Sequence, residues 1–216
     1  MKELTVQSFT GNVPEPGPES AARLAETLPG IALDNANWAA FPYTPEVSFR
    51  IACSPDYFHL SFTVREDGLR AVCDKINGEV YQDSCVEFFL APGDEPAYYN
   101  FEFSCIGVPH VAYGTSRHDR QRIDPEVLSG IRTHSTLGNK PFGVLPGLHS
   151  WQLQILIPLN CLVHHPGIRL TGLTARANFY KCGDLAPRPH FLSWNPVSTP
   201  EPDFHQQRYF GKLYFV

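Results

Sequence analysis

Two glutamates occupy positions where a β-sheet would bring them together. In residues 85–90 apolar side chains alternate with Glu87, and residues 98–113 begin with the same alternation around Glu102. If the turn between these segments centres near Asp94-Glu95, Glu87 lies directly across from Glu102. Like charges that face each other across a strand pair are destabilising. We therefore expect a cation, a shared proton or a polar ligand to offset the pair.

Further polar residues fall on the same sheet face by parity. Asn100 shares the face of Glu102, and the later segment 168–180 places two more polar side chains together on one face. The predicted polar face consists of Glu87, Asn100, Glu102, Arg176 and Asn178. The alternative is a solvated outer face with an ordinary salt bridge. A third interpretation takes Glu87 and Glu102 as the carboxylates of a glycoside hydrolase, which retaining members hold about 5–5.5 Å apart.

Side chains that bind metals or anions are otherwise scattered. The nine histidines form no HExxH motif and the six cysteines form no CxxC pair, so we expect no metal site and buried, reduced thiols. Calcium could use Asp34, Asp83, Asp94 and Asp184, but no EF-hand spacing supports it. The basic cluster at residues 117–122 indicates a solvated loop or, alternatively, a loop folded over the site that offers arginine to a carboxylate.

The composition excludes several function classes. The 216 residues include 17 Lys and Arg against 22 Asp and Glu, which gives a formal net charge of −5. This charge provides no electrostatic reason to bind nucleic acid or an anionic membrane. We find no signal-peptide core and no apolar run long enough to span a membrane. We therefore expect a cytoplasmic protein as the sequence is written, or a periplasmic or secreted one if a leader was removed.

Short strand-like segments separated by turns would position these residues. With 16 Gly, 20 Pro and 12% aromatic residues, the chain is typical of a turn-rich β protein. We expect about ten strands, a hairpin formed by residues 47–53 and 57–65, and one helix over residues 20–28. The three tryptophans are assigned to structural positions: Trp38, Trp151 and Trp194. The pattern predicts an all-β fold, a single immunoglobulin-like β-sandwich with few short helices.

Seven short motifs follow one another along the chain. They are QDSCVEFF at 82–89, YYNFE at 98–102, WQL at 151–153, NFYKCGD at 178–184, PHFLSW at 189–194, PDFH at 202–205 and FGKL at 210–213. In this order they resemble carbohydrate-binding module family 9, specifically its family 9-like branch of stand-alone proteins seen in gut-type Bacteroidetes. The resemblance runs from about residue 34 to the C-terminus. It implies one DOMON-related β-sandwich over residues 1–216, with residues 1–33 as an N-terminal extension.

The resemblance also implies a sugar site. In family 9 modules two aromatic side chains clamp a terminal sugar, and nearby polar groups hydrogen-bond its hydroxyls. The acid of the family motif falls on Glu87, and the two clamp positions fall on Tyr81 and Phe204. The family's arginine falls near Glu102, which is an acid, so Arg176 could supply the positive charge instead.

The expected function is therefore non-catalytic binding of an oligosaccharide or glycan end, in glycan handling or catabolism. Nucleic acid is not expected as a partner. No cofactor is expected, with structural calcium as a further option. Haem, which some DOMON relatives bind through Met and His, is not expected because the only methionine is Met1. Two alternatives stay open: a glycoside hydrolase that uses Glu87 and Glu102, and a family 9-like scaffold that has lost sugar binding.

Overall fold

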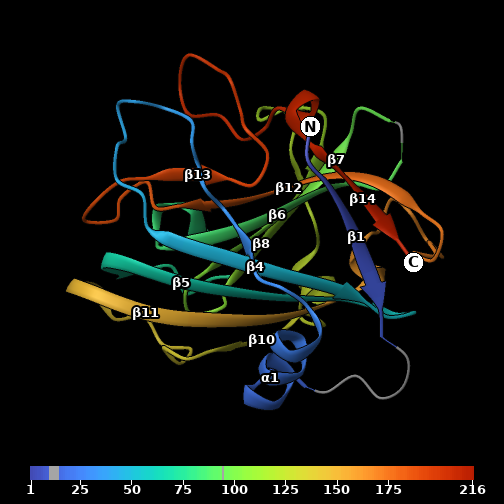
Figure 1. Ribbon diagram of the computed structural model, residues 1–216, viewed down its shortest axis with the longest axis horizontal. Helices are drawn as coiled ribbons and strands as arrows, with labels where there is room; N and C mark the ends of the chain where they lie inside the picture. The colour runs from blue at the N-terminus through green and yellow to red at the C-terminus, as the bar shows by residue number, and fades with distance from the viewer. Residues whose placement is uncertain (10–14, 94) are drawn as a thin grey trace.

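The computed structural model describes residues 1–9, 15–93 and 95–216, and over these residues the chain is nearly all β (Figure 1). The strands are β1 (Glu3–Ser8), β2 (Ile31–Ala32), β3 (Asn35–Ala36), β4 (Glu46–Cys53), β5 (Tyr57–Ala71), β6 (Cys85–Ala91), β7 (Tyr98–Ser104), β8 (Pro109–Gly114), β9 (Gln121–Arg122), β10 (Arg132–Ser135), β11 (Gly143–Pro158), β12 (Thr174–Cys182), β13 (Phe191–Ser193) and β14 (Gly211–Phe215). The helices are α1 (Pro18–Thr27) and α2 (Pro125–Leu128), and the short 3-10 helices are η1 (Val80–Gln82), η2 (Leu159–Cys161) and η3 (Gln207–Tyr209).

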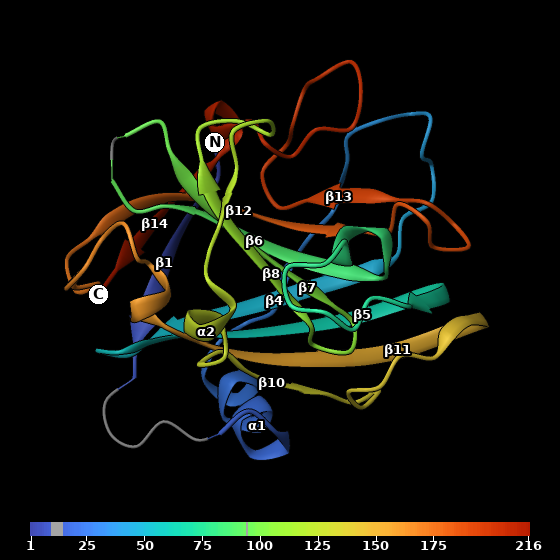
Figure 2. The same cartoon turned by 180° about the vertical axis from the view of Figure 1, so that it is seen from behind.

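The strands form two layers that pack face to face (Figures 1 and 2). The first layer has the order β10-β11-β5-β4, and the second has the order β14-β12-β6-β7-β8-β9. Strand β1 joins the layers, because its residues 3–6 pair in parallel with β14 and its residues 7–8 pair in parallel with β4. The predicted all-β sandwich is confirmed. The described residues form fourteen strands, more than the ten or so expected, because several are only two residues long.

Aromatic side chains fill the space between the layers. Phe49 of β4 stacks on Phe179 of β12 with 3.8 Å between the ring centroids, and Phe58 of β5 meets Phe88 of β6 at 5.7 Å. Successive residues of a strand point to opposite faces, so the neighbours of these phenylalanines along each strand point away from the space between the layers. Trp151 and Trp194 are buried in this core, as the sequence predicted.

The hairpin of β6 and β7 has the register expected from the sequence. Glu87 pairs with Glu102 and Phe88 pairs with Phe101, so apolar side chains meet in the core and the two carboxylates meet on the outer face. Asp94, at the expected centre of the turn, lies outside the described residues. The predicted hairpin of residues 47–53 and 57–65 is also present, as β4 and β5.

The expectation of one strand over residues 98–113 is wrong. The chain reverses at Gly107 and forms β7 and β8, which pair antiparallel. Gly107 has φ 84°, and a Cβ there would lie 2.4 Å from the Oγ1 atom of Thr133. Only glycine adopts this backbone conformation readily and fits the space, so a single residue inside an otherwise apolar run creates the turn.

The N-terminal segment is part of the sheet. Residues 1–33, expected as an extension, contribute β1, α1 and β2. Helix α1 covers nearly the predicted range and lies on the outer side of the first layer (Figure 2). No helix within the described ranges is long and apolar enough to cross a membrane.

A second aromatic cluster covers part of the outer face of the second layer. It includes Phe89 of β6 and Tyr180 of β12, Trp38 from the segment after β3, and Phe204 and Phe210 from the segment between β13 and β14. The indole nitrogen of Trp38 donates to the carbonyl oxygen of Thr199 and so holds one of these loops. A cavity opens beside this cluster on the same face, and the candidate site lies there.

Candidate functional site

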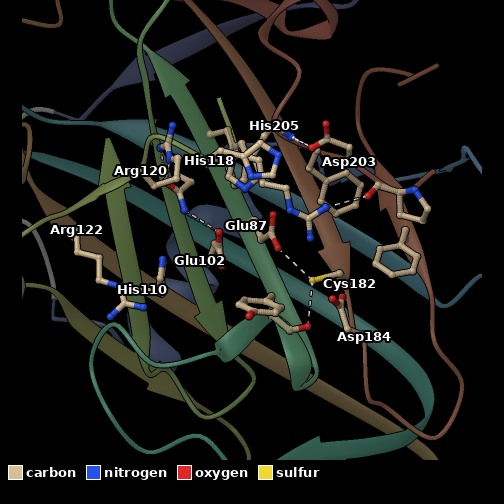
Figure 3. Close-up of a pocket in the computed structure, with 17 residues that line it drawn as sticks. Glu87, Glu102, His110, His118, Arg120, Arg122, Cys182, Asp184, Asp203 and His205 are labelled. Atoms are coloured by element: carbon tan, nitrogen blue, oxygen red, sulfur yellow. Dashed lines mark hydrogen bonds between the residues drawn. The ribbon is translucent and has the colours of Figure 1, made fainter. Parts of the chain in front are cut away.

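A cavity of about 350 Å³ opens on the outer face of the second layer. Its floor is formed by side chains of β6, β7, β8 and β12, and its walls come from residues 117–122 and 202–205. The lining residues are Tyr81, Glu87, Phe89, Asn100, Glu102, His110, Arg117, His118, Arg120, Arg122, Cys182, Asp184, Phe191, Pro202, Asp203, Phe204 and His205. Figure 3 shows Glu87 and Glu102 near its centre, with Arg122 and His110 on one side and Cys182 and Asp184 on the other.

The two floor carboxylates are almost completely buried, with 3% and 4% exposure for Glu87 and Glu102. Glu87 Oε1 accepts a hydrogen bond from the Cys182 thiol at 3.1 Å, and Glu102 Oε1 accepts one from Asn100 Nδ2 at 2.7 Å. The Oε2 atoms of both have no hydrogen-bond partner among the described residues. Burial, and next the nearby charge of Glu102, raise the pKa of Glu87 well above its usual range. The floor therefore offers a ligand two buried carboxyl oxygens that have no partner among the described residues.

Arg120 holds the basic segment against the cavity. Its guanidinium donates to the carbonyl oxygens of Tyr98, Ala112 and Gly114 at 2.8–2.9 Å, and to the side-chain oxygen of Asn100. The guanidinium also lies 4.4 Å from the centre of the Tyr98 ring. Of the two interpretations of residues 117–122, the structure agrees with a loop folded over the site, because four of these six residues line the cavity.

The opposite wall is aromatic and largely buried. The Phe204 ring stacks on Tyr180 with 4.0 Å between centroids and is 8% exposed, so it packs in the wall and offers only part of its surface to a ligand. His205 hydrogen-bonds the Tyr98 hydroxyl at 3.0 Å. Burial, together with the charge of Arg120, lowers the pKa of His205 to about 3, so this imidazole is neutral at physiological pH.

The structure brings together five of the seven expected site residues: Tyr81, Glu87, Asn100, Glu102 and Phe204. Arg176 and Asn178 do not line the cavity. Both occupy the expected face of β12, but Arg176 is six residues from Cys182, or about 20 Å along a strand. Parity fixes the face of a side chain and not its place along the strand.

Asn178 has a structural role. Its amide nitrogen donates to the carbonyl oxygen of Asn195 at 3.0 Å, and its amide oxygen accepts from the backbone N–H of Asn195 at 2.9 Å. It is fully buried and fastens the chain after β13 to the sheet.

A sequence model of carbohydrate-binding family 9 matches residues 20–215. The chain belongs to carbohydrate-binding family 9. No curated protein matches the sequence. A protein from Bacteroides uniformis ATCC 8492, described as a candidate carbohydrate-binding protein, is 38% identical, with a TM-score of 0.95 and coverage of 100% of this chain and 99% of that one.

Two more distant structures share the family 9 fold. Both are of a family 9 module from Caldicellulosiruptor kristjanssonii, in complex with glucose and with cellotriose. They are 12% and 13% identical to this chain, with TM-scores of 0.63 and 0.62. The first match covers 100% of this chain and 96% of that one, and the second covers 99% and 93%. At this identity the likeness concerns the fold.

Several lining residues of this family 9 chain were not expected from the sequence. His110, Cys182, Asp184, Asp203 and His205 all face the cavity. Burial raises the pKa of Asp184 to about 6, with a smaller contribution from Glu102. Strand parity could have indicated two of them. His110 is paired with Glu102 on the outer face, and Cys182 shares the outer face of β12 with Asn178. The others lie in segments without periodicity.

Among the residues that the structure describes, the aspartates considered for calcium do not gather into a cluster. Asp83 is satisfied by Arg70 and by two backbone N–H groups, and Asp34 is exposed and pairs with Lys2. Asp184 lines the cavity, and Asp94 is outside the described residues. All six cysteines are free thiols, and five of them are buried. Two of these, Cys85 and Cys182, lie beside Glu87, with the three ligand atoms within 4.8 Å of one another.

Proposed function

We propose that this family 9 protein is a carbohydrate-binding protein without catalytic activity, and that the cavity takes an oligosaccharide or glycan end. The observation that carries the proposal is the pair of buried carboxylates at the cavity floor, each with an oxygen that has no partner among the described residues. Buried acceptors without donors are costly. Sugar hydroxyls are donors that would satisfy them, while the apolar faces of the sugar ring pack on aromatic walls.

The arrangement of the carboxylates favours binding over hydrolysis. Glycoside hydrolases place their two carboxylates on either side of the scissile bond. Glu87 and Glu102 are directly paired residues on adjacent strands and share one sheet face, so both meet the same side of a ligand. The glucose and cellotriose complexes of the Caldicellulosiruptor module support a sugar as the partner. A role in glycan handling or catabolism follows as part of the proposal.

The test is calorimetric titration of the purified chain with glucose, cellotriose and a broad glycan panel that includes acidic sugars. We expect saturable binding to at least one glycan, with affinity reduced at least tenfold by Glu87→Gln and by Phe204→Leu. The matched control is Glu201→Gln, an exposed carboxylate that does not line the cavity. If no glycan in the panel binds, the protein is a scaffold without a sugar ligand. If aryl glycosides are hydrolysed and Glu87→Gln abolishes turnover, it is an enzyme.

A further inference from the structure

We propose that Cys85, Glu87 and Cys182 form a binding site for a thiophilic divalent cation of the zinc class, at the floor of the cavity. This goes beyond the proposed sugar binding and does not depend on it. Two sulfur donors and one carboxylate match the preferences of zinc, whereas calcium and magnesium favour oxygen donors alone.

The sheet places these donors in one spot. Cys85 of β6 and Cys182 of β12 are directly paired across the two strands, and Glu87 lies two residues from Cys85 on the same face. The distance from Cys182 Sγ to Glu87 Oε1 is 3.1 Å, and the three donor atoms lie within 4.8 Å of one another. With Zn–S near 2.3 Å and Zn–O near 2.0–2.2 Å, neighbouring donors of a tetrahedral site are about 3.5–3.8 Å apart. Rotations of the side chains that move them by about 1 Å would produce that geometry.

A second observation indicates a missing ligand. Glu87 is 97% buried, since its exposure is 3%, and its Oε2 has no hydrogen-bond partner within the described part of the chain. Glu102, directly opposite, has an unpartnered Oε2 as well. Lys181, the residue before Cys182, points to the other face of β12 and pairs with Glu66 at 3.0 Å. A bound cation would neutralise charge where the protein places two carboxylates side by side.

Binding is a ligand exchange without oxidation or reduction. Water molecules leave the hydrated ion as two S–Zn bonds and one O–Zn bond form; the S–H bonds of Cys85 and Cys182 break, and the two thiol protons, with the carboxyl proton where Glu87 carries one, pass to solvent. Glu87 and Cys182 both line the cavity, so the fourth position of the ion faces the cavity. Water or an oxygen of a bound molecule would complete the coordination.

The test uses the full chain, reduced with a phosphine and stripped of metal with a chelator. Zn²⁺ is titrated in competition with a chromophoric chelator, and Cd²⁺ is added separately because its thiolate complexes absorb in the ultraviolet. We expect one Zn²⁺ per chain, a Cd²⁺–thiolate band, and no comparable response to Ca²⁺. Cys85→Ala and Cys182→Ala should weaken Zn²⁺ binding at least tenfold and reduce the band. Glu87→Gln should weaken Zn²⁺ binding and keep the band.

The matched control is Cys161→Ala, a buried cysteine in η2 that does not line the cavity. Absence of stoichiometric binding to the wild-type chain would overturn the proposal, and so would an equal loss in Cys161→Ala. Binding abolished by Cys73→Ala would place the ion on the half-buried thiol outside the cavity floor, which also overturns it. The wild-type Cd²⁺ band and the Glu87→Gln titration decide the question even if a cysteine variant fails to fold. Because neither readout uses a glycan, a failure of sugar binding leaves this result intact.

Discussion

Replacing Glu102 by glutamine should stabilise the sugar-free protein, and more so at high pH. Glu87 and Glu102 are directly paired and buried, and directly opposed Cβ atoms in antiparallel strands lie about 4.5–5.5 Å apart. Two charges about 6 Å apart at an effective dielectric constant of about 20 repel by about 3 kcal/mol. The glutamine retains the shape of the side chain and can still accept a hydrogen bond from Asn100.

The sign of the pH dependence follows from Glu87. Its pKa is raised in the folded chain, mainly by burial and next by Glu102, so folding binds a proton and stability falls as the pH rises above the ordinary value of 4.5. Removing the charge of Glu102 lowers the folded pKa of Glu87 and reduces this fall. The stabilisation should therefore be smallest at pH 5, close to the ordinary value of 4.5, and should approach about 2–3 kcal/mol at pH 9.

Urea unfolding at pH 5, 7 and 9 in the presence of a chelator measures this difference. Glu201→Gln, an exposed carboxylate, is the control and should change the free energy of unfolding by less than about 0.5 kcal/mol at every pH. The reasoning is refuted if the difference between Glu102→Gln and wild type is the same at pH 5 and pH 9. It is also refuted if the variant is the less stable protein at pH 9.

Three other perturbations test the remaining assignments. Asn178→Ala removes three buried hydrogen bonds to the backbone and should destabilise the fold by about 2–4 kcal/mol in urea unfolding without changing glycan affinity; a folded variant with lower affinity would contradict its structural role. Lys181→Met leaves the buried carboxylate of Glu66 unpaired and should cost about 3–5 kcal/mol; a cost below about 1 kcal/mol would argue against an ion pair there. Burial lowers the pKa of His59 to about 4 and that of His205 to about 3. The stability that these neutral imidazoles contribute is therefore fully present above pH 6.5 and is lost as the pH falls through those values. His59→Asn should flatten the decline of Tm between pH 6.5 and 4, and an unchanged slope would contradict this account.

The sequence predicted those parts of the site that follow from regular alternation. Val86 and Phe88 of β6 and Phe101 and Phe103 of β7 point to the core, and a one-residue slip would turn them outward, so Glu87 and Glu102 share the outer face and a short turn places them opposite each other. The limit of the same reasoning appears at Arg176, which shares the face but lies at the far end of β12.

The walls of the cavity were less accessible to prediction. Arg120 reaches the site through hydrogen bonds to three carbonyl groups, and neither the spacing nor the composition of the loop encodes those contacts. The ring of Phe204 was placed at the site by resemblance, but its stacking on Tyr180 depends on how the loop after β13 folds. The pairing of Cys85 with Cys182 needed the register of β6 and β12, which are far apart in sequence and joined by no short turn.

The position of β1 has a consequence for how this chain is made. Glu3 of β1 pairs with Lys212 of β14, more than 200 residues later in the chain. Strand β1 therefore cannot complete its pairing until β14 has been made. During synthesis β4 can pair with β2 and β5 early, while residues 174–177 of β12 lack their partner strand until β14 has been made. Chains interrupted before residue 211 would leave this edge of β12 exposed and should aggregate, which makes the pairing of β14 with β12 and β1 the last step in completing the sheet.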